Sequence, residues 1–182
     1  MMHIAWRLAR RFFCLATLLL VTGCWQGKQF YSAKESAAPL AAGRYVTADR
    51  TGATGGAVTV TRLPSGATRV AGLKAVLGSD SADVVFAAVT GLPPETWITQ
   101  VADPSGDALF GLLARRNGKM MLQPFILCQK DLAEIAKSAG AQVPPSTEIE
   151  PPCIFPDRAS LERAMIRIAP KLEFMAEVRP VK

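Results

Sequence analysis

The chain has 182 residues, of which 49% are hydrophobic and 20% are charged, so its composition suits one folded domain and argues against extensive disorder. The formal net charge is +6, but Arg7, Arg10 and Arg11 precede every acidic residue, and 18 basic against 15 acidic residues from Cys24 onward leave +3. This weak excess, with aromatic residues at 7%, gives no reason to expect a nucleic-acid partner.

The first 23 residues have the parts of a secretory signal peptide. Three arginines lie within residues 1–11, and residues 12–22 (FFCLATLLLVT) form a short apolar core. A helix needs about 20 apolar residues to cross a bilayer, whereas runs of about 10–14 are typical of signal-peptide cores. We therefore predict a signal peptide over residues 1–23 rather than a buried N-terminal helix.

The end of the apolar core carries a lipidation motif. Val21-Thr22-Gly23-Cys24 resembles the lipobox of bacterial lipoproteins, in which an aliphatic residue, a small residue and Gly or Ala precede an obligatory Cys. The resemblance covers residues 1–24. It implies cleavage after Gly23 by the type II signal peptidase, a diacylglyceryl group on the Cys24 sulfur and acylation of the new amino group. A plain secreted protein is the alternative, but no A-x-A-like cleavage site lies nearby.

The lipid anchor would place the protein in the cell envelope. One acyl chain gives marginal membrane binding, whereas two or three chains on Cys24 would hold the protein firmly in the lipid bilayer. In enteric bacteria an Asp after the lipidated Cys retains the protein in the inner membrane, and this chain has Trp25 there. The resemblance therefore implies an outer-membrane protein that faces the periplasm.

Residues 24–42 are predicted to form the lipidated cysteine and a flexible tether, because the stretch WQGKQFYSAKESAAPLAA shows no clear hydrophobic period. A single domain over residues 43–182 is expected to follow. At about 3.3 Å per residue, the tether could reach roughly 60 Å from the membrane.

From Gly43 onward, apolar runs separated by turn signals predict an antiparallel sheet. Asn117-Gly118 favours a type I′ hairpin turn, because both central residues of that turn need a positive φ. A strand or a frayed tail fits residues 171–182. The other candidate strands are residues 43–49, 57–63, 67–73, 84–92, 96–102, 109–115 and 119–125.

Two short helices are predicted after the strands. Apolar residues recur at helical spacing over residues 129–140, which end at Gly140, and Asp157 can cap a second helix. Because the helices follow the strands, we predict the α+β class. The sheet would have about six or seven antiparallel strands, with the two helices near the C-terminus covering one face.

Cysteine usage predicts one disulfide. Cys14 leaves with the leader and Cys24 takes the lipid, so Cys128 and Cys153 remain as an even pair in an oxidising compartment. Two buried free thiols are the alternative. By the chain-entropy model, closing a loop of about 25 residues contributes roughly 3.5 kcal/mol to stability.

The sequence shows no catalytic motif. Its only histidine is His3, in the predicted leader, so the mature chain has no imidazole for nucleophilic catalysis or a metal site. The acidic pairs Asp80/Asp83 and Asp103/Asp107 flank turns, where aspartates commonly cap backbone groups. We expect no catalytic residue, no metal ligand and no cofactor.

These observations predict a non-catalytic, membrane-anchored envelope lipoprotein that serves as a binding or structural module. Its expected partners are the lipid bilayer and either an envelope protein or peptidoglycan, with no nucleic acid. Two other functions stay open. One is a carrier of a small apolar ligand in a barrel-like cavity, and the other is a hydrolase of cell-wall glycans that uses two carboxylates about 5–10 Å apart.

Overall fold

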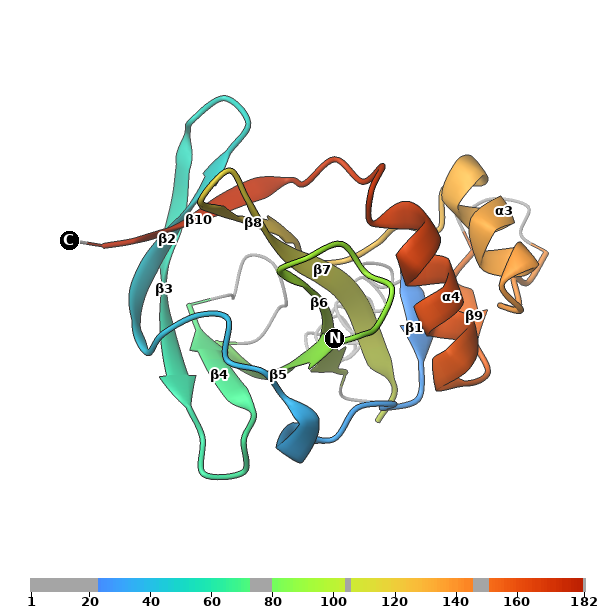
Figure 1. Cartoon of the computed structure of the whole chain (residues 1–182), viewed down its shortest axis with the longest axis horizontal. Helices are drawn as coiled ribbons and strands as arrows, with labels where there is room; N and C mark the ends of the chain where they lie inside the picture. Colours follow the sequence, from blue (N-terminus) through green and yellow to red (C-terminus); the bar gives the residue numbers. More distant parts are fainter. Residues whose placement is uncertain (1–22, 73–79, 104–105, 146–150, 182) are drawn as a thin grey trace, which may run out of the picture.

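The computed structural model describes residues 23–72, 80–103, 106–145 and 151–181, so Val21 and Thr22 of the lipobox lie outside the described residues. The described chain consists mainly of strands (Figure 1). Within it, no helix combines the length and the hydropathy needed to cross a bilayer. The strands are β1 (Trp25–Gly27), β2 (Gly43–Asp49), β3 (Thr54–Arg62), β4 (Thr68–Ala71), β5 (Ser81–Ala88), β6 (Thr96–Ala102), β7 (Ala108–Arg116), β8 (Lys119–Gln123), β9 (Cys153–Phe155) and β10 (Ala176–Pro180). The helical segments are η1 (Ala33–Glu35), α3 (Lys130–Ser138) and α4 (Arg158–Ile168).

Eight of these strands form a closed antiparallel barrel. Strands β2 to β8 pair in chain order, and β10 completes the ring between β8 and β2. Val178 of β10 lies opposite Thr47 of β2 on one side and opposite Met120 of β8 on the other. The C-terminal segment is therefore a strand, and this strand closes the barrel.

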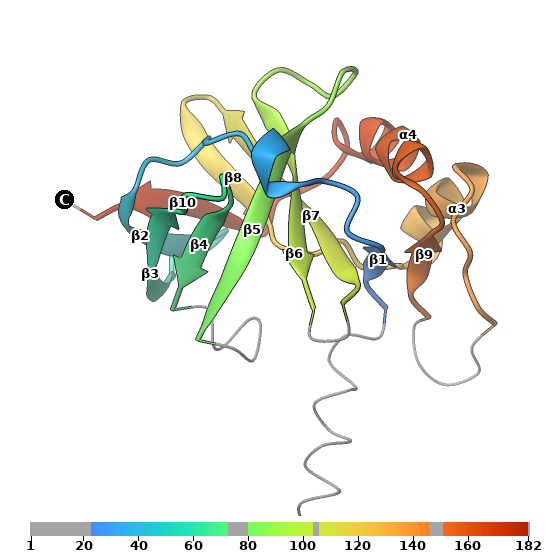
Figure 2. The same ribbon diagram turned by 90° about the horizontal axis from the view of Figure 1, so that it is seen from below.

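The predicted α+β class, with an open sheet of six or seven strands, is wrong. The described residues form ten strands, of which eight close on themselves, while β1 and β9 extend the sheet from β7. The two helices lie on one side of the barrel, beside β1 and β9, and do not cover a whole sheet face (Figure 2). Apolar alternation along a strand is the same in an open sheet and in a barrel, so the sequence pattern did not show the closure.

Several predicted elements are confirmed. Strands β2 and β6 have the predicted bounds, and both helices lie where the sequence placed them. Asn117 and Gly118 have φ values of 51° and 76°, as a type I′ turn between β7 and β8 requires. The side chain of Asp157 caps α4, because it accepts a hydrogen bond of 2.7 Å from the Ser160 N–H.

The barrel wall separates two hydrophobic cores. The inner core fills much of the barrel, and the outer core lies between the barrel wall, β1, β9 and the two helices. Strand β7 contributes to both, with Leu113 facing inward and Leu112 facing outward, which explains its almost continuous apolar sequence. The outer core includes Trp25, Phe110, Phe155, Leu161, Met165 and Ile168.

The segment predicted to be a flexible tether is packed against the barrel instead. Trp25 in β1 is fully buried, and Tyr31 is nearly so. Further along, the Ala37 N–H donates to the Phe86 carbonyl of β5 at 2.8 Å. The folded structure therefore includes the twenty residues before Gly43.

Candidate functional site

Cys24, the predicted lipidation site, lies at the start of β1 and is 5% exposed. It forms a β-bridge with Leu127, and its carbonyl accepts a hydrogen bond of 3.2 Å from the Cys153 N–H. The carbonyl of Gly23 accepts a hydrogen bond from the Cys128 N–H. Burial raises the pKa of the Cys24 thiol, which disfavours its thiolate form.

The predicted disulfide between Cys128 and Cys153 is confirmed. The two Cα atoms are 5.4 Å apart, within the usual span of a disulfide, and both side chains are buried in the outer core. The bond joins the segment after β8 to β9. The structure thus brings the lipobox cysteine and both disulfide cysteines together on neighbouring segments of one sheet.

The strand pairings show on which face of the sheet each of these residues lies. Side chains alternate along a strand, and residues opposite one another on paired strands share a face. Trp25 lies opposite Cys153, and both are buried in the outer core. Cys24, its bridge partner Leu127, and Ile154 therefore point to the other face, away from the helices.

We call Cys24, Leu127 and Ile154 the anchor face. Leu127 is 39% exposed and Ile154 is 36% exposed, and they are two of the four exposed large hydrophobic side chains of the described residues. The predicted lipid attachment point is thus flanked by apolar surface. The sequence singled out Cys24 as a candidate but not Leu127 or Ile154, because nothing in their local sequence shows that they share a face with it.

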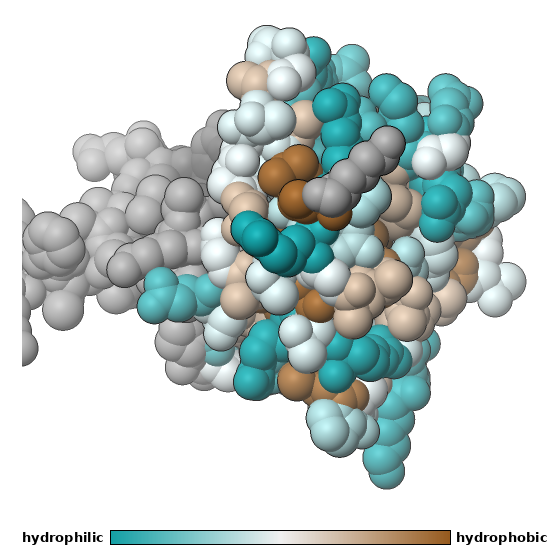
Figure 3. All heavy atoms as spheres, turned by 90° about the vertical axis from the view of Figure 1, so that its left-hand side faces the viewer, coloured by the Kyte–Doolittle hydropathy of each residue, from teal (hydrophilic) through white to brown (hydrophobic). Residues whose placement is uncertain are grey.

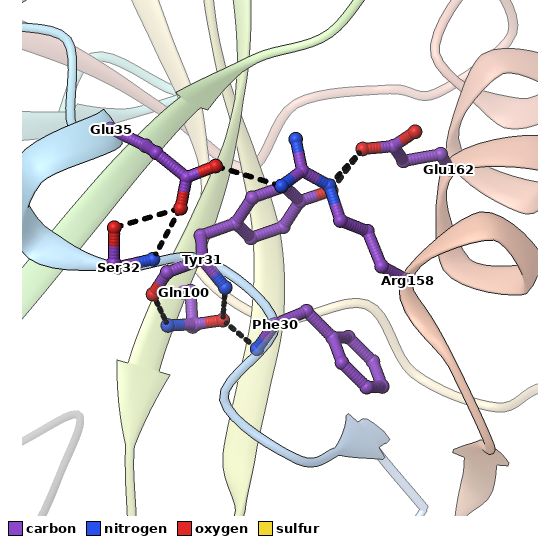
Figure 4. Close-up of polar contacts among 7 residues, drawn as sticks. All are labelled: Phe30, Tyr31, Ser32, Glu35, Gln100, Arg158 and Glu162. Carbon is purple, nitrogen blue, oxygen red and sulfur yellow. Dashed lines mark hydrogen bonds and ion pairs between the residues drawn. The ribbon is translucent and has the colours of Figure 1, made fainter.

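The segment after β1 is held to the barrel by one buried amide. The Gln100 side chain of β6 is 3% exposed, and its Oε1 accepts from the Phe30 N–H at 2.8 Å and from the Tyr31 N–H at 3.0 Å (Figure 4). Its Nε2 donates to the Tyr31 carbonyl at 2.8 Å. A strand amide therefore satisfies three backbone groups of the supposed tether.

A second set of contacts joins the same segment to α4. The Arg158 guanidinium lies 4.5 Å from the centroid of the Tyr31 ring and forms ion pairs of 2.8 Å with Glu35 and with Glu162 (Figure 4). The Tyr31 hydroxyl also lies 3.1 Å from a Glu162 carboxylate oxygen. Burial and then the Glu162 charge raise the pKa of Tyr31 well above its usual range, so the phenol stays protonated.

The Glu35 contacts predict a specific pH dependence of stability. Hydrogen bonds from the Ser32 amide and then from Arg158 lower the pKa of Glu35 from 4.5 to about 2. A carboxylate with a lowered folded-state pKa contributes stability above its unfolded-state pKa and loses it as the pH falls through the folded value. We expect Glu35→Gln to be less stable than the wild type at neutral pH, with the difference shrinking between pH 4.5 and about 2.

Urea unfolding across that pH range would measure this difference. Glu177 also has a pKa lowered to about 2, mainly by Arg179, so Glu177→Gln is a second test of the same relation and should show the same shrinking difference. If the difference in the free energy of unfolding between Glu35→Gln and the wild type stayed constant from pH 5 to pH 2, the prediction would be contradicted.

The barrel interior contains a partly open apolar cavity of about 90 Å³. Among the described residues, Thr47 and Thr99 are the only polar residues in its lining, and no charged side chain contributes. The cavity is lined by inward-facing aliphatic side chains from most of the barrel strands, among them Val58, Val70, Val84, Val101, Leu113 and Val178.

Gly111 of β7 allows the segment after β8 to pass close to the barrel wall and cover one part of the cavity. A Cβ on this glycine would collide with the carbonyl oxygens of Gln123 and Pro124. Without a side chain there, the chain after β8 crosses close to β7, and Pro124 and Phe125 reach the cavity lining.

In each acidic turn, one carboxylate forms an ion pair with a basic side chain. Asp83 forms an ion pair of 2.8 Å with Arg69, and Asp107 forms one of 2.6 Å with Lys28. Among the described residues, no cluster of three or more His, Cys, Asp or Glu could hold a metal ion.

A shallow hollow of about 420 Å³ lies beside β10, and its cations are already paired. Arg179 and Lys119 contact Glu177 at 2.7 and 3.3 Å, and Arg50 contacts Glu173 at 2.5 Å. The neighbouring surface over β2, β3 and β10 mixes hydrophilic and apolar side chains (Figure 3). This hollow shows no feature that selects a ligand.

Comparison with known proteins found no matching family model, no similar curated protein and no similar solved structure.

Proposed function

We propose that the protein is a non-catalytic lipoprotein of the bacterial envelope, anchored through Cys24 and seated directly on the membrane surface. The observation that carries the proposal is the anchor face, where Cys24 lies opposite the exposed side chain of Leu127 and on the same face as the exposed side chain of Ile154. An acylated Cys24 would place these two side chains at the lipid headgroups, where apolar side chains add to membrane binding.

No flexible linker separates Cys24 from the sheet that extends the barrel. The Trp25 N–H, one residue after Cys24, donates to the Ile126 carbonyl at 2.8 Å, and β1 then pairs with β7 and β9. A lipid on Cys24 would therefore be attached to the sheet itself. The module would serve partners close to the bilayer surface, an envelope protein or peptidoglycan near the membrane, rather than partners roughly 60 Å away as a tether would allow.

Mass spectrometry of the protein purified from membranes tests the anchor. The expected N-terminal peptide begins at Cys24, carries a diacylglyceryl group and an amide-linked acyl chain, and lacks residues 1–23. Cys24→Ser should abolish incorporation of labelled palmitate, whereas a variant with both Cys128→Ala and Cys153→Ala should still incorporate it. An unmodified Cys24 with the leader attached would refute the proposal.

The anchor face predicts a definite membrane depth. A tryptophan introduced as Ile154→Trp should be quenched by lipids brominated near the headgroup when the acylated protein is bound to vesicles. Thr59→Trp, at an exposed position on β3, is the matched control and should stay unquenched. Equal quenching at both positions would show that the anchor face does not meet the membrane.

A further inference from the structure

We propose that the barrel cavity is a binding site for a small, neutral, mainly apolar molecule that carries one hydroxyl or carbonyl group, held by the hydroxyl of Thr99. This site does not depend on the lipid anchor. It uses the interior of the barrel, whereas the anchor face lies on the sheet extension outside it.

The first part of the argument is the space itself. An eight-stranded barrel either fills its interior with side chains or leaves room for one small ligand. Here a cavity of about 90 Å³ remains within the inner core. An apolar protein cavity of about 150 Å³ is large enough to bind benzene, so one of about 90 Å³ suits a smaller molecule, such as a short branched alkyl group with one oxygen.

The second part is the Thr99 hydroxyl. Thr99 is 3% exposed and lines the cavity, and its Oγ1 has no hydrogen-bond partner among the described residues. Its neighbours across the sheet are Phe86 on β5 and Gly111 on β7, and neither has a polar side chain to offer. A buried hydroxyl without a partner costs free energy, which a ligand oxygen at this point would recover.

The lining decides the class of ligand. No charged side chain of the described residues reaches the cavity, so an ionised ligand would lose its hydration without compensation. A buried water usually makes two to four hydrogen bonds, and a wall that is apolar apart from Thr47 and Thr99 offers few partners. A molecule with an apolar body and a single oxygen can form a hydrogen bond with the Thr99 hydroxyl and make apolar contacts with the rest of the lining.

The test compares 2-propanol with propane, which differ by one hydroxyl. The full chain would be placed in lipid nanodiscs with labelled valine, leucine and threonine methyl groups, and each probe would be titrated by NMR. Both probes are expected to shift the methyl signals of Val84, Val101 and Leu113. The contribution of the Thr99 hydroxyl is the change that Thr99→Val makes in the affinity for each probe.

Variants at Thr99 separate the contribution of its hydroxyl to binding from the contribution of the cavity volume. Thr99→Val keeps the side-chain shape but leaves the hydroxyl of the alcohol without a partner, so it should bind 2-propanol about 10-fold more weakly than the wild type does and propane within twofold of the wild type. Thr99→Ser should bind both probes as the wild type does. If Thr99→Val does not fold, Thr99→Ala gives the same comparison of the two probes.

Two results would overturn the proposal. The absence of cavity methyl shifts at millimolar concentrations of both probes would show that the cavity binds neither. A Thr99→Val variant that binds 2-propanol as tightly as the wild type, or a long-lived water at Thr99 that neither probe displaces, would show that the hydroxyl is not a ligand contact.

Discussion

Replacing Trp25 with alanine is expected to lower the free energy of unfolding by about 3–5 kcal/mol, the usual cost of removing a large buried aromatic side chain. Trp25 is fully buried, and its ring centroid lies 4.9 Å from that of Phe155. Urea unfolding followed by circular dichroism would measure the change without using tryptophan fluorescence. This prediction decides between a packed N-terminal segment and a free tether.

Trp25→Phe is the matched control. The indole Nε1 has no hydrogen-bond partner among the described residues, so phenylalanine loses no polar contact there. We expect it to cost less than about 1.5 kcal/mol, because the swap keeps an aromatic ring in the outer core. If Trp25→Ala unfolds within about 0.5 kcal/mol of the wild type, β1 is not packed as described.

Removing the disulfide through Cys128→Ala and Cys153→Ala is expected to destabilise the protein by about 3.5 kcal/mol, because the bond closes a loop with a sequence separation of 25. For a chain of this size, the melting temperature should fall by roughly 7–14 °C. Thermal unfolding in non-reducing buffer would show the change.

Reduction of the wild type provides the control for the disulfide. The reduced wild type should melt close to the double variant, and adding reductant to the double variant should change nothing. A double variant that melts with the oxidised wild type would show that the bond contributes no stability.

Local signals in the sequence were sufficient for elements that depend on local interactions. The Asn117-Gly118 turn, the Asp157 cap and the bounds of β6 follow from turn chemistry, capping and apolar pattern. The Cys128–Cys153 bond followed from counting cysteines and from the predicted oxidising compartment.

Barrel closure could not be predicted in the same way. It requires β10 to pair with β2, more than 120 residues earlier in the chain, and pairing at that distance leaves no local pattern. Strands β1 and β9 have three residues each, which is too short to show a period.

Two signals in the supposed tether and its partner strand were available but were not used. Ser32 and Glu35 have the S-x-x-E spacing of a capping box, and in the structure the Glu35 carboxylate accepts from the Ser32 N–H at 2.8 Å. Gln100 is a polar residue within an apolar strand, which indicates a buried polar contact. Thr99 gave no comparable signal, because threonine is common in strands.

The alternation of side chains in the sheet extension has a consequence for oxidative maturation. Cys24 lies beside Cys153 along the backbone but points to the opposite face, so the fold holds a third sulfur apart from the bonded pair. Thiol–disulfide exchange needs an accessible thiolate that can reach the bonded sulfurs, and burial disfavours the Cys24 thiolate. Scrambling that involves an unmodified Cys24 would therefore require β1 to separate from the sheet first, and a thioether-linked lipid on Cys24 would remove the attacking thiol altogether.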